Sequence, residues 1–338
     1  MSLIKMNIVD AHLDLAYNAL RGREVAQPAS KQTASFGDGT PSVGFPDLVA
    51  GSVGLICATI FCEPAKGDLP GYHTAEQARA QALDQLHWYQ KQAAKGLIEL
   101  ITTSVQLSPP PKLPAVQAIL LMEGADPFRS PQDVAEWHSA GLRIVGLAWK
   151  ATRMAGGTGE PGPLTAEGRE IIKALDACGI IHDTSHLAEE SFWQLLKASQ
   201  GPIMASHSNC RSIVPTDRQL SDEMIKAIAH RDGIIGLNFF DKFLLRPAEY
   251  QTRRAHLTDL VEHIRHMCDL IGDANHVGIG TDMDGGFGME HIPEEIRTSA
   301  DLGRVADALR AGGFTQAEVE GIMGGNWVRF FEKNLPGS

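Results

Sequence analysis

Eight short runs of apolar residues recur along the chain, and each is followed by a longer stretch of helical character. The runs cover residues 7–14, 54–61, 117–124, 144–149, 180–186, 203–207, 234–240 and 276–282. Within them, apolar residues follow one another almost without interruption, which is typical of parallel strands that are covered on both faces. The pattern therefore predicts eight buried strands.

The stretches between these runs predict helices. They cover residues 74–95, 131–140, 165–178, 187–199, 221–231, 256–271, 299–311 and 315–325. The third of them carries clear boundary signals, because Thr165 can cap its N-terminus, Glu167 lies in its first turn and Gly179 can end it. Thr315 and Glu318 form a capping-box pattern at the start of the last one.

Eight strands that alternate with helices predict an α/β fold, a (β/α)8 TIM barrel formed by residues 1–338 as one domain. A ninth apolar run, residues 96–103, lies in the long connection between the second and third strands and is expected to form an accessory strand outside the barrel. A doubly wound open sheet fits less well, because no Gly-rich phosphate fingerprint follows the first strand. The Gly- and Pro-rich loop 151–164 follows the fourth strand, where a barrel carries substrate loops.

Ionisable side chains stand at the C-terminal ends of five predicted strands. They are His12, Asp14, Glu123, His186, His207 and Asp282. The C-terminal ends of barrel strands meet at one rim, the rim that carries catalysis. Side chains alternate along a strand, so positions 12 and 14 are expected to point the same way. Imidazole nitrogens and carboxylate oxygens bind Zn²⁺, and the sequence therefore predicts a metal site at this rim.

A single histidine at a strand end is more often a hydrogen-bonded core residue than a metal ligand. Six ionisable groups on one sheet need partners, because a buried carboxylate without one is strongly destabilising. No matching set of Lys or Arg ends the other strands, whereas bound cations would compensate the charges. Six groups exceed the four ligands that one zinc ion usually takes. They suit two metal ions about 3.5–4 Å apart that share a carboxylate and activate a water molecule.

Charge and cysteine content exclude several other classes of function. The chain has 30 basic and 41 acidic residues, a net charge of −11, and no Lys/Arg-rich run, which argues against nucleic-acid binding. Its 5 cysteines show no pairing pattern, so we expect reduced thiols. No signal peptide is apparent, and no apolar run reaches the roughly 18 residues of a membrane span. These features together predict a cytoplasmic protein that does not enter membranes.

Six segments resemble, in order, the signatures of the membrane dipeptidase (renal dipeptidase) family, peptidase family M19, within the amidohydrolase superfamily. They read DAHLDL, LMEGAD, DTSHL, MASHSNCRSI, GIGTDMDGG and GGNWVRFF. The likeness extends from about residue 6 to residue 332. It implies a distorted (β/α)8 barrel of the metal-dependent hydrolase type, two zinc ions, and hydrolysis of dipeptides, including some with a D-residue at the C-terminal side. By analogy, we also expect a homodimer.

The resemblance also assigns roles to the residues of the predicted metal site. His12 and Asp14 resemble the ligands of one zinc ion. His186 and His207 resemble the ligands of the second zinc ion. Glu123 resembles the carboxylate that bridges the two ions.

Three further residues are expected to act on the substrate. Asp282 resembles the acid/base that moves a proton from the bridging water to the leaving amine. Arg218, eleven residues after His207, stands where the family places an arginine for the substrate carboxylate, a contact that suits a fork of N–H donors. Trp149 departs from the family pattern, because the best-known members have a histidine there that holds the substrate or the tetrahedral intermediate. An indole N–H donates one hydrogen bond but cannot become cationic.

Three hypotheses therefore stay open. The first is a zinc-dependent dipeptidase, although other divalent metals suit the same ligands. The second is the same dinuclear barrel acting on another small amide, such as an N-acyl amino acid, or on a lactone, and Trp149 is the reason to consider it. The third is a barrel that holds metal for binding or scaffolding alone. The complete ligand set and the presence of Asp282 favour an enzyme.

Overall fold

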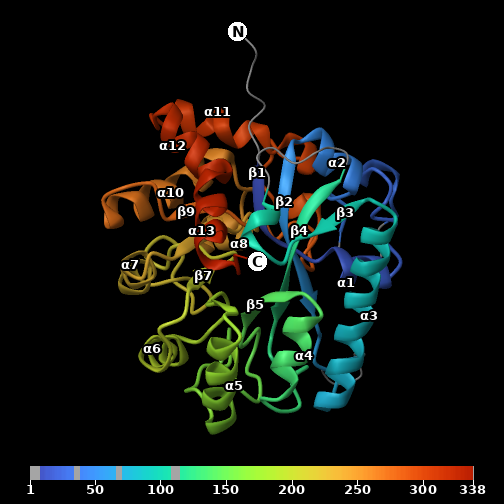
Figure 1. The fold of residues 1–338 in the computed structure, drawn as a ribbon. Helices are drawn as coiled ribbons and strands as arrows, with labels where there is room; N and C mark the ends of the chain where they lie inside the picture. The colour runs from blue at the N-terminus through green and yellow to red at the C-terminus, as the bar shows by residue number, and fades with distance from the viewer. Residues whose placement is uncertain (1–7, 34–38, 66–70, 108–114, 338) are drawn as a thin grey trace.

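Eight parallel strands form a closed ring at the centre of the molecule (Figure 1). The computed structural model describes residues 8–33, 39–65, 71–107 and 115–337. The strands of the ring are β1 (Ile8–Leu13), β2 (Val53–Phe61), β4 (Val116–Glu123), β5 (Leu142–Gly146), β6 (Ile181–Asp183), β7 (Ile203–Ala205), β8 (Ile234–Leu237) and β9 (Val277–Ile279). Pairing of β2 with β4 closes the sheet, so the predicted (β/α)8 barrel is confirmed. Residue 7, at the start of the first predicted strand, lies outside the described residues.

The remaining strand, β3 (Ile98–Leu100), pairs with the first part of β4, residues Val116, Gln117 and Ala118. Further along, β4 pairs with β5 instead. Figure 1 shows β3 next to β4 at the margin of the ring. The segment predicted as an accessory strand therefore extends the sheet at one end of β4 and is not part of the closed ring.

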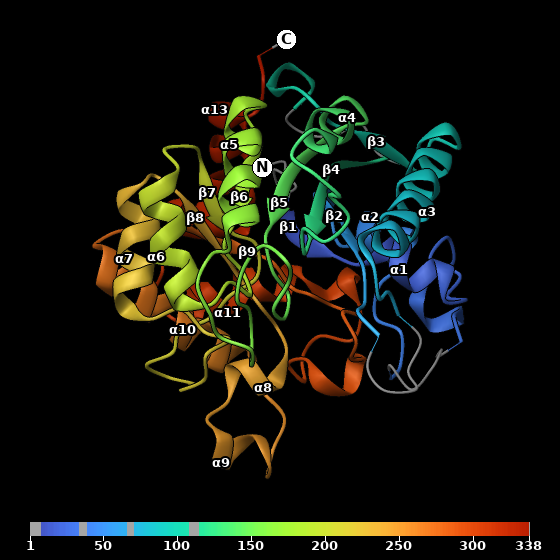
Figure 2. The same cartoon turned by 90° about the horizontal axis from the view of Figure 1, so that it is seen from below.

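Helices surround this ring of strands (Figures 1 and 2). They are α1 (Leu15–Leu20), α2 (Phe45–Ala50), α3 (Ala75–Ala94), α4 (Asp133–Ser139), α5 (Ala166–Ala177), α6 (Glu189–Ala198), α7 (Asp222–His230), α8 (Asp241–Leu244), α9 (Pro247–Tyr250), α10 (Leu257–Ile271), α11 (Gly303–Ala311), α12 (Gln316–Glu320) and α13 (Asn326–Asn334). Thr165 caps α5 by accepting a hydrogen bond from the Gly168 N–H. Among the described residues, no helix combines the length and apolar character that a membrane span requires.

The C-terminal helical segment differs from the prediction. The helix predicted over 315–325 ends at Glu320 and continues as a wide turn, Gly321–Gly325, before α13 begins. Three glycines in that turn weaken the helix, because glycine loses the most backbone freedom on folding. The helix α13 itself was not predicted from the sequence.

The core has two layers. Apolar side chains between the strands and the surrounding helices form the outer layer. The inner layer fills the barrel and includes Val9, Leu121 and Ile181. At the N-terminal end of the barrel, α13 adds Trp327, whose Nε1–H donates to the carbonyl oxygen of Ile279 at 3.0 Å. That end is therefore closed by packed apolar side chains, and the opposite rim remains available for a site.

Candidate metal centre

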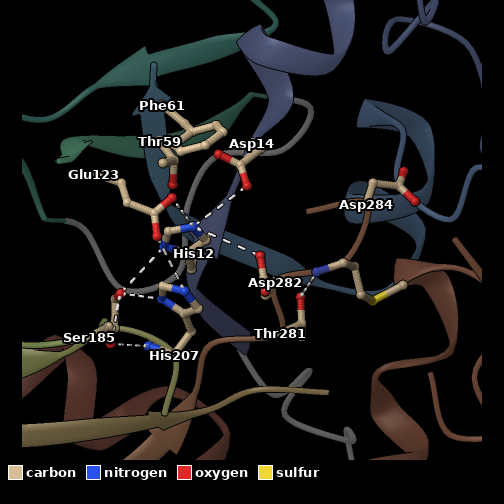
Figure 3. A network of polar contacts seen from close by, with 12 residues as sticks. His12, Asp14, Thr59, Phe61, Glu123, Ser185, His207, Thr281, Asp282 and Asp284 are labelled. Atoms are coloured by element: carbon tan, nitrogen blue, oxygen red, sulfur yellow. Dashed lines mark hydrogen bonds and ion pairs between the residues drawn. The ribbon is translucent and has the colours of Figure 1, made fainter. Parts of the chain in front are cut away.

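The six ionisable side chains predicted at the rim lie together in the structure. In Figure 3, the labelled side chains among them point toward one another. Their ligand atoms form three overlapping groups, and within each group all atoms lie within 4.8 Å of one another. The groups are His12, Asp14 and Glu123; Glu123, His186 and His207; and His12, His207 and Asp282. Residues that are up to 270 positions apart in the sequence (282 − 12 = 270) therefore meet at one point.

The first of these groups comes from β1, the turn that follows it, and β4, and both strands pair with β2. β1 carries His12, and Glu123 is the last residue of β4. Asp14 lies past the end of β1, at the N-cap of α1. The register between β1 and β2 shifts between Asp10 and Leu13, so strict alternation does not hold there. Asp14 thus reaches His12 from the turn into α1, not from the strand as predicted.

His186, His207 and Asp282 also lie beyond their strands. β6, β7 and β9 end at Asp183, Ala205 and Ile279, so the predicted strands 180–186, 203–207 and 276–282 were too long. His186 and Asp282 have φ angles of 65° and 59°, which is a left-handed conformation. For residues other than glycine this conformation costs of order 1–3 kcal/mol and is concentrated at functional sites.

His12 faces three carboxylates from one side of the cluster. Its Nε2 atom lies 3.6 Å from Asp14 Oδ2, 3.8 Å from Glu123 Oε2 and 3.9 Å from Asp282 Oδ1. These separations are too long for hydrogen bonds. They are close to the roughly 3.4 Å expected between two ligand atoms that each bind one ion at about 2.1 Å in tetrahedral geometry.

Glu123 presents its other carboxylate oxygen to the two remaining histidines. Oε1 lies 3.2 Å from His186 Nε2 and 3.6 Å from His207 Nε2. The two Nε2 atoms are 3.1 Å apart. The Oε2 atom of Glu123 therefore faces His12, and its Oε1 atom faces His186 and His207. A carboxylate that bridges two ions requires such an arrangement.

Several atoms of the cluster are buried without hydrogen-bond partners. They include His12 Nε2, Asp14 Oδ1 and Glu123 Oε1. Buried polar atoms normally have a partner, because leaving one unsatisfied costs about 1–3 kcal/mol or more. All three atoms can bind a metal ion, and the donor set therefore fits a metal site.

The electrostatics of the cluster also favour a cation. Burial raises the pKa of Glu123 and of Asp282 above the ordinary range of carboxyl groups. Burial alone would lower the pKa of His12, but the surrounding carboxylates, Glu123 first among them, raise it to about 10. Burial lowers the pKa of His186 and His207 well below the usual value. The imidazoles of His186 and His207 are therefore neutral, whereas the carboxylates keep that of His12 protonated. A divalent ion can replace the proton of His12 in such a site.

The carboxylate of Asp282 is held in a defined position. Asn238 Nδ2 donates to Asp282 Oδ2 at 2.9 Å, and Oδ1 is the oxygen that faces His12. Gly285 packs so closely that a Cβ atom there would lie 2.0 Å from Asp282 Oδ1. Gly285 is therefore required for this position of the carboxylate.

The cluster opens into a cavity of about 360 Å³ with aromatic walls. Tyr17, Phe61 and Trp149 form one series of rings, with centroids 5.3 Å and 5.2 Å apart in edge-on contacts. Phe240 and Phe287 form a second group, stacked 4.4 Å apart. A cavity of this size suits a small molecule with apolar parts.

The comparison with known families agrees with this site. A model of the membrane dipeptidase family, peptidase family M19, matches residues 3–335, a range that includes every residue of the cluster. This chain belongs to the membrane dipeptidase family. The resemblance identified from six sequence segments is therefore confirmed.

Two solved structures of metallo peptidases match almost the whole chain. Dipeptidase AC, a metallo peptidase of family M19, is 26% identical with a TM-score of 0.85, over 99% of this chain and 100% of that one. A metallo peptidase from Rhodobacter sphaeroides, liganded with a phosphinate mimic of the dipeptide L-Ala-D-Ala, is 25% identical with a TM-score of 0.83, over 97% and 99%. The predicted enzyme class, a metal-dependent hydrolase, is confirmed by the family and these relatives.

Curated sequences match over shorter stretches. An uncharacterised protein from the pqqA 5′ region of Klebsiella pneumoniae is 32% identical over 218 residues, which is 62% of this chain and 78% of its own length. An uncharacterised dipeptidase of Schizosaccharomyces pombe is 27% identical over 210 residues, 59% of this chain and 48% of its own. The match thus spans about half the length of the yeast relative.

Arg218 lies beside the cluster and is not among the residues that line the cavity. Its guanidinium donates to Ser208 Oγ at 3.1 Å and to the carbonyl oxygen of His207 at 2.6 Å. It lies over the ring of Phe243, 5.2 Å from the centroid, while Nε is buried without a hydrogen-bond partner. Its predicted contact with a substrate carboxylate stays a prediction.

Trp149 lines the cavity. Its ring centroid lies 6.4 Å from that of His186. The indole is thus close to the metal centre, and its role in substrate binding stays a prediction.

Sequence reasoning missed a charged group at the mouth of the cavity. Tyr17 donates its hydroxyl hydrogen to Glu63 at 2.6 Å, and Arg21 forms an ion pair with Glu63 at 3.2 Å. All three residues line the cavity. A signal was available, because Glu63 follows β2 and so occupies the same rim as the other ionisable residues.

Proposed function

We propose that this chain hydrolyses the peptide bond of dipeptides, including those with a D-residue at the C-terminal side, with two zinc ions bound at the rim. The observation that carries the proposal is the position of Glu123. One of its oxygens faces His12 and the other faces His186 and His207, and two metal ions with a shared carboxylate would use such an arrangement.

The chain itself offers the ligands for both ions. His12 and Asp14 would hold the first ion, His186 and His207 the second, and Glu123 would contact both. When bound, the ions supply a water molecule of lowered pKa and polarise the carbonyl group of the substrate. Burial of the cluster strengthens these electrostatic effects, because little solvent screens them.

Asp282 is proposed to move the proton. Its Oδ1 faces the cluster while Asn238 holds Oδ2, so one oxygen is free to accept a proton from the attacking water. Burial raises its pKa, and a carboxyl group with a raised pKa can both accept and return a proton near neutral pH. It would then deliver that proton to the leaving nitrogen atom.

The substrate would lie in the aromatic cavity next to the cluster. Arg218 is proposed to receive the C-terminal carboxylate, and Trp149 to contact the substrate near His186. The phosphinate dipeptide mimic in the Rhodobacter sphaeroides relative supports a substrate of this class. The small volume of the cavity, about 360 Å³, favours short substrates over long peptides.

Trp149 favours a second candidate function. An indole in place of a histidine can donate one hydrogen bond but supplies no positive charge. A substrate whose transition state needs less stabilisation at that position would suit this site better. Such substrates include other small amides of the N-acyl amino acid type and lactones.

One screen tests both functions. The purified protein would be stripped with a chelator, reloaded with zinc, manganese or cobalt, and assayed on L,L- and L,D-dipeptides, C-terminally amidated dipeptides, N-acyl amino acids and lactones. We expect dipeptide hydrolysis that disappears on chelation and returns with zinc, with close to two ions per chain by metal analysis. Hydrolysis that survives chelation would contradict the metal mechanism. A protein with its full metal content that does not hydrolyse dipeptides but hydrolyses lactones would favour the second function.

A further inference from the structure

Each of the three histidines in the cluster has its second ring nitrogen next to a hydroxyl group. The Ser206 Oγ atom lies 2.7 Å from His207 Nδ1 and 3.3 Å from His12 Nδ1. Thr158 Oγ1 lies 3.0 Å from His186 Nδ1. The Nε2 atoms of all three rings face the cluster. One serine therefore contacts two rings that come from different parts of the barrel, while the third ring has a hydroxyl of its own.

The direction of these hydrogen bonds follows from Asp183. Ser206 Oγ donates to Asp183 Oδ2 at 2.5 Å. The other oxygen of that carboxylate accepts from the backbone N–H groups of Ser185, at 3.0 Å, and of Ser206 itself, at 2.8 Å. An ionised carboxylate accepts only, so the single hydroxyl hydrogen of Ser206 goes to Asp183. The contact between Ser206 Oγ and Ser185 Oγ is longer, at 3.4 Å.

The lone pairs of the Ser206 oxygen are then left for the two imidazoles. A hydroxyl oxygen can accept two hydrogen bonds while it donates one. His12 and His207 would both donate from Nδ1–H, and each ring would keep Nε2 without a proton. A ring nitrogen without a proton is the form that binds a metal ion. Ser206 and Asp183 are both buried, so water does not easily replace these contacts.

We propose that Ser206, held by Asp183, is a positioning residue that fixes the tautomer and the orientation of one histidine ligand from each of the two metal sites. This inference rests on the proposed function, because it assumes that His12 and His207 bind different ions. The outer partners of metal-bound histidines set ring orientation and commonly change metal affinity by 10–100-fold when they are removed. Here one hydroxyl would do so for both sites at once.

Thr158 provides a matched comparison. It offers the same type of contact to His186, but it lies on the loop after β5 and is only partly buried. Thr158→Val removes that hydroxyl at nearly constant volume. We expect it to weaken one of the two metal sites, whereas Ser206→Ala should weaken both.

Asp183→Asn separates positioning from packing. The carboxamide oxygen would replace Oδ1 and accept from the two backbone N–H groups, so its NH₂ group would face Ser206. Ser206 would then receive a hydrogen bond there and would have to donate its own hydrogen to one of the imidazoles. That ring would favour the tautomer with its proton on Nε2, which binds metal less well, although the size of the side chain at 183 hardly changes.

The experiment measures zinc affinity by competition with a chromophoric chelator, together with ion count per chain and the visible absorption of the cobalt-loaded protein. For Ser206→Ala and Asp183→Asn we expect zinc affinity to fall 10–100-fold and the cobalt spectrum to change. For Thr158→Val we expect one tight and one weakened site. Thermal unfolding of the chelated proteins checks that the variants fold.

The positions of the histidine protons can also be measured in the parent protein, which does not depend on whether a variant folds. With zinc bound, ¹⁵N–¹H spectra of the histidine side chains should show protons on Nδ1 of His12 and His207. Protons on Nε2 of either ring would overturn the inference, as would folded Ser206→Ala and Asp183→Asn proteins with zinc affinity within about twofold of the parent. A parent protein that binds no metal would instead refute the proposed function, and this inference with it.

Discussion

The N-terminal end of the barrel is sealed by α13, whereas the C-terminal rim holds ionisable groups with buried atoms that have no hydrogen-bond partner. At the sealed end, Trp327 is fully buried, stacks on Phe331 at 5.5 Å and donates a hydrogen bond to a strand carbonyl. Asn326 Nδ2 donates to the carbonyl oxygens of Ala274 and Val277 at 2.7 Å and 2.8 Å. Polar groups at this end have partners, and the packing contributes to stability.

The rim is built in the opposite way. His12 Nε2 and Glu123 Oε1 are buried without hydrogen bonds, and His186 and Asp282 adopt left-handed backbone conformations. Such features lower the stability of the folded chain and are retained where function needs them. Under the proposed function, one end of the barrel contributes stability and the other carries catalysis, so substitutions at the two ends should have separable effects.

The largest effect is expected at the rim, for Asp282→Asn. The amide cannot accept and return a proton, so kcat on the best dipeptide should fall by about 10²–10⁴-fold while the protein still binds metal. The measurement is steady-state kinetics with metal analysis of the same sample. Asp284→Asn is the matched control, because this buried aspartate of the same loop binds Ser42 and Arg23 and is not part of the cluster.

For Asp284→Asn we expect a loss of stability with little change in kcat of the folded enzyme. If Asp282→Asn turned over dipeptides at nearly the parental rate, Asp282 would not be the proton carrier. If both variants lost activity equally, the whole loop and not one carboxylate would be responsible.

At the sealed end, Trp327→Ala is expected to lower the free energy of unfolding by about 3–5 kcal/mol. The cavity left under α13 and the lost hydrogen bond to Ile279 account for this effect. The kcat of the folded fraction should stay close to that of the parent, since the site is at the other end. Urea denaturation and kinetics at low temperature measure the two quantities.

Trp193→Ala provides the control for this substitution, because Trp193 is 40% exposed on α6. We expect its free energy of unfolding to change by less than about 0.5 kcal/mol. A Trp327→Ala protein that kept full stability, or whose folded state had a lower kcat, would contradict the idea that the sealed end affects stability alone.

The sequence was sufficient to predict the ring of strands and the group of residues at its rim. Continuous apolar runs are typical of strands covered on both faces. Glu123 is the last residue of β4, and His207 lies shortly after the end of β7. Charged groups at the ends of buried strands require compensation, whatever the details of the backbone. These two facts are independent of exact element boundaries, so the meeting of these residues at one rim was predictable although several strands proved shorter.

The contacts around the ligands were not predictable in this way. Asp183 looks like an ordinary residue at the end of a strand, and Ser206 like one just after a strand. The contacts of Ser206 with His12 and Asp183 join segments that are distant in sequence. The left-handed conformation of His186 likewise depends on its tertiary surroundings, because nothing in the local sequence requires it.

The smallest effect concerns pH and the metal-free protein. Among the carboxylates, the pKa of His12 is raised to about 10, so the folded chain holds this proton at pH values where the unfolded chain has lost it. That stabilisation is complete below about pH 6.5 and is lost as the pH rises toward 10. Burial of Glu123 and Asp282 raises their pKa and acts in the same direction, because deprotonation of a buried carboxyl group destabilises the fold.

We therefore expect the free energy of unfolding of the chelated protein to decrease between pH 7 and pH 8.5, by at most about 1.4 kcal/mol per pH unit for each proton involved. With zinc bound, the ions replace these protons and the slope should largely vanish. Urea denaturation at several pH values, with and without chelator, measures both slopes. The same slope in both forms would mean that the protons do not come from the rim. The metal-free rim would then not differ from the end closed by Trp327 in how well its buried polar groups are paired.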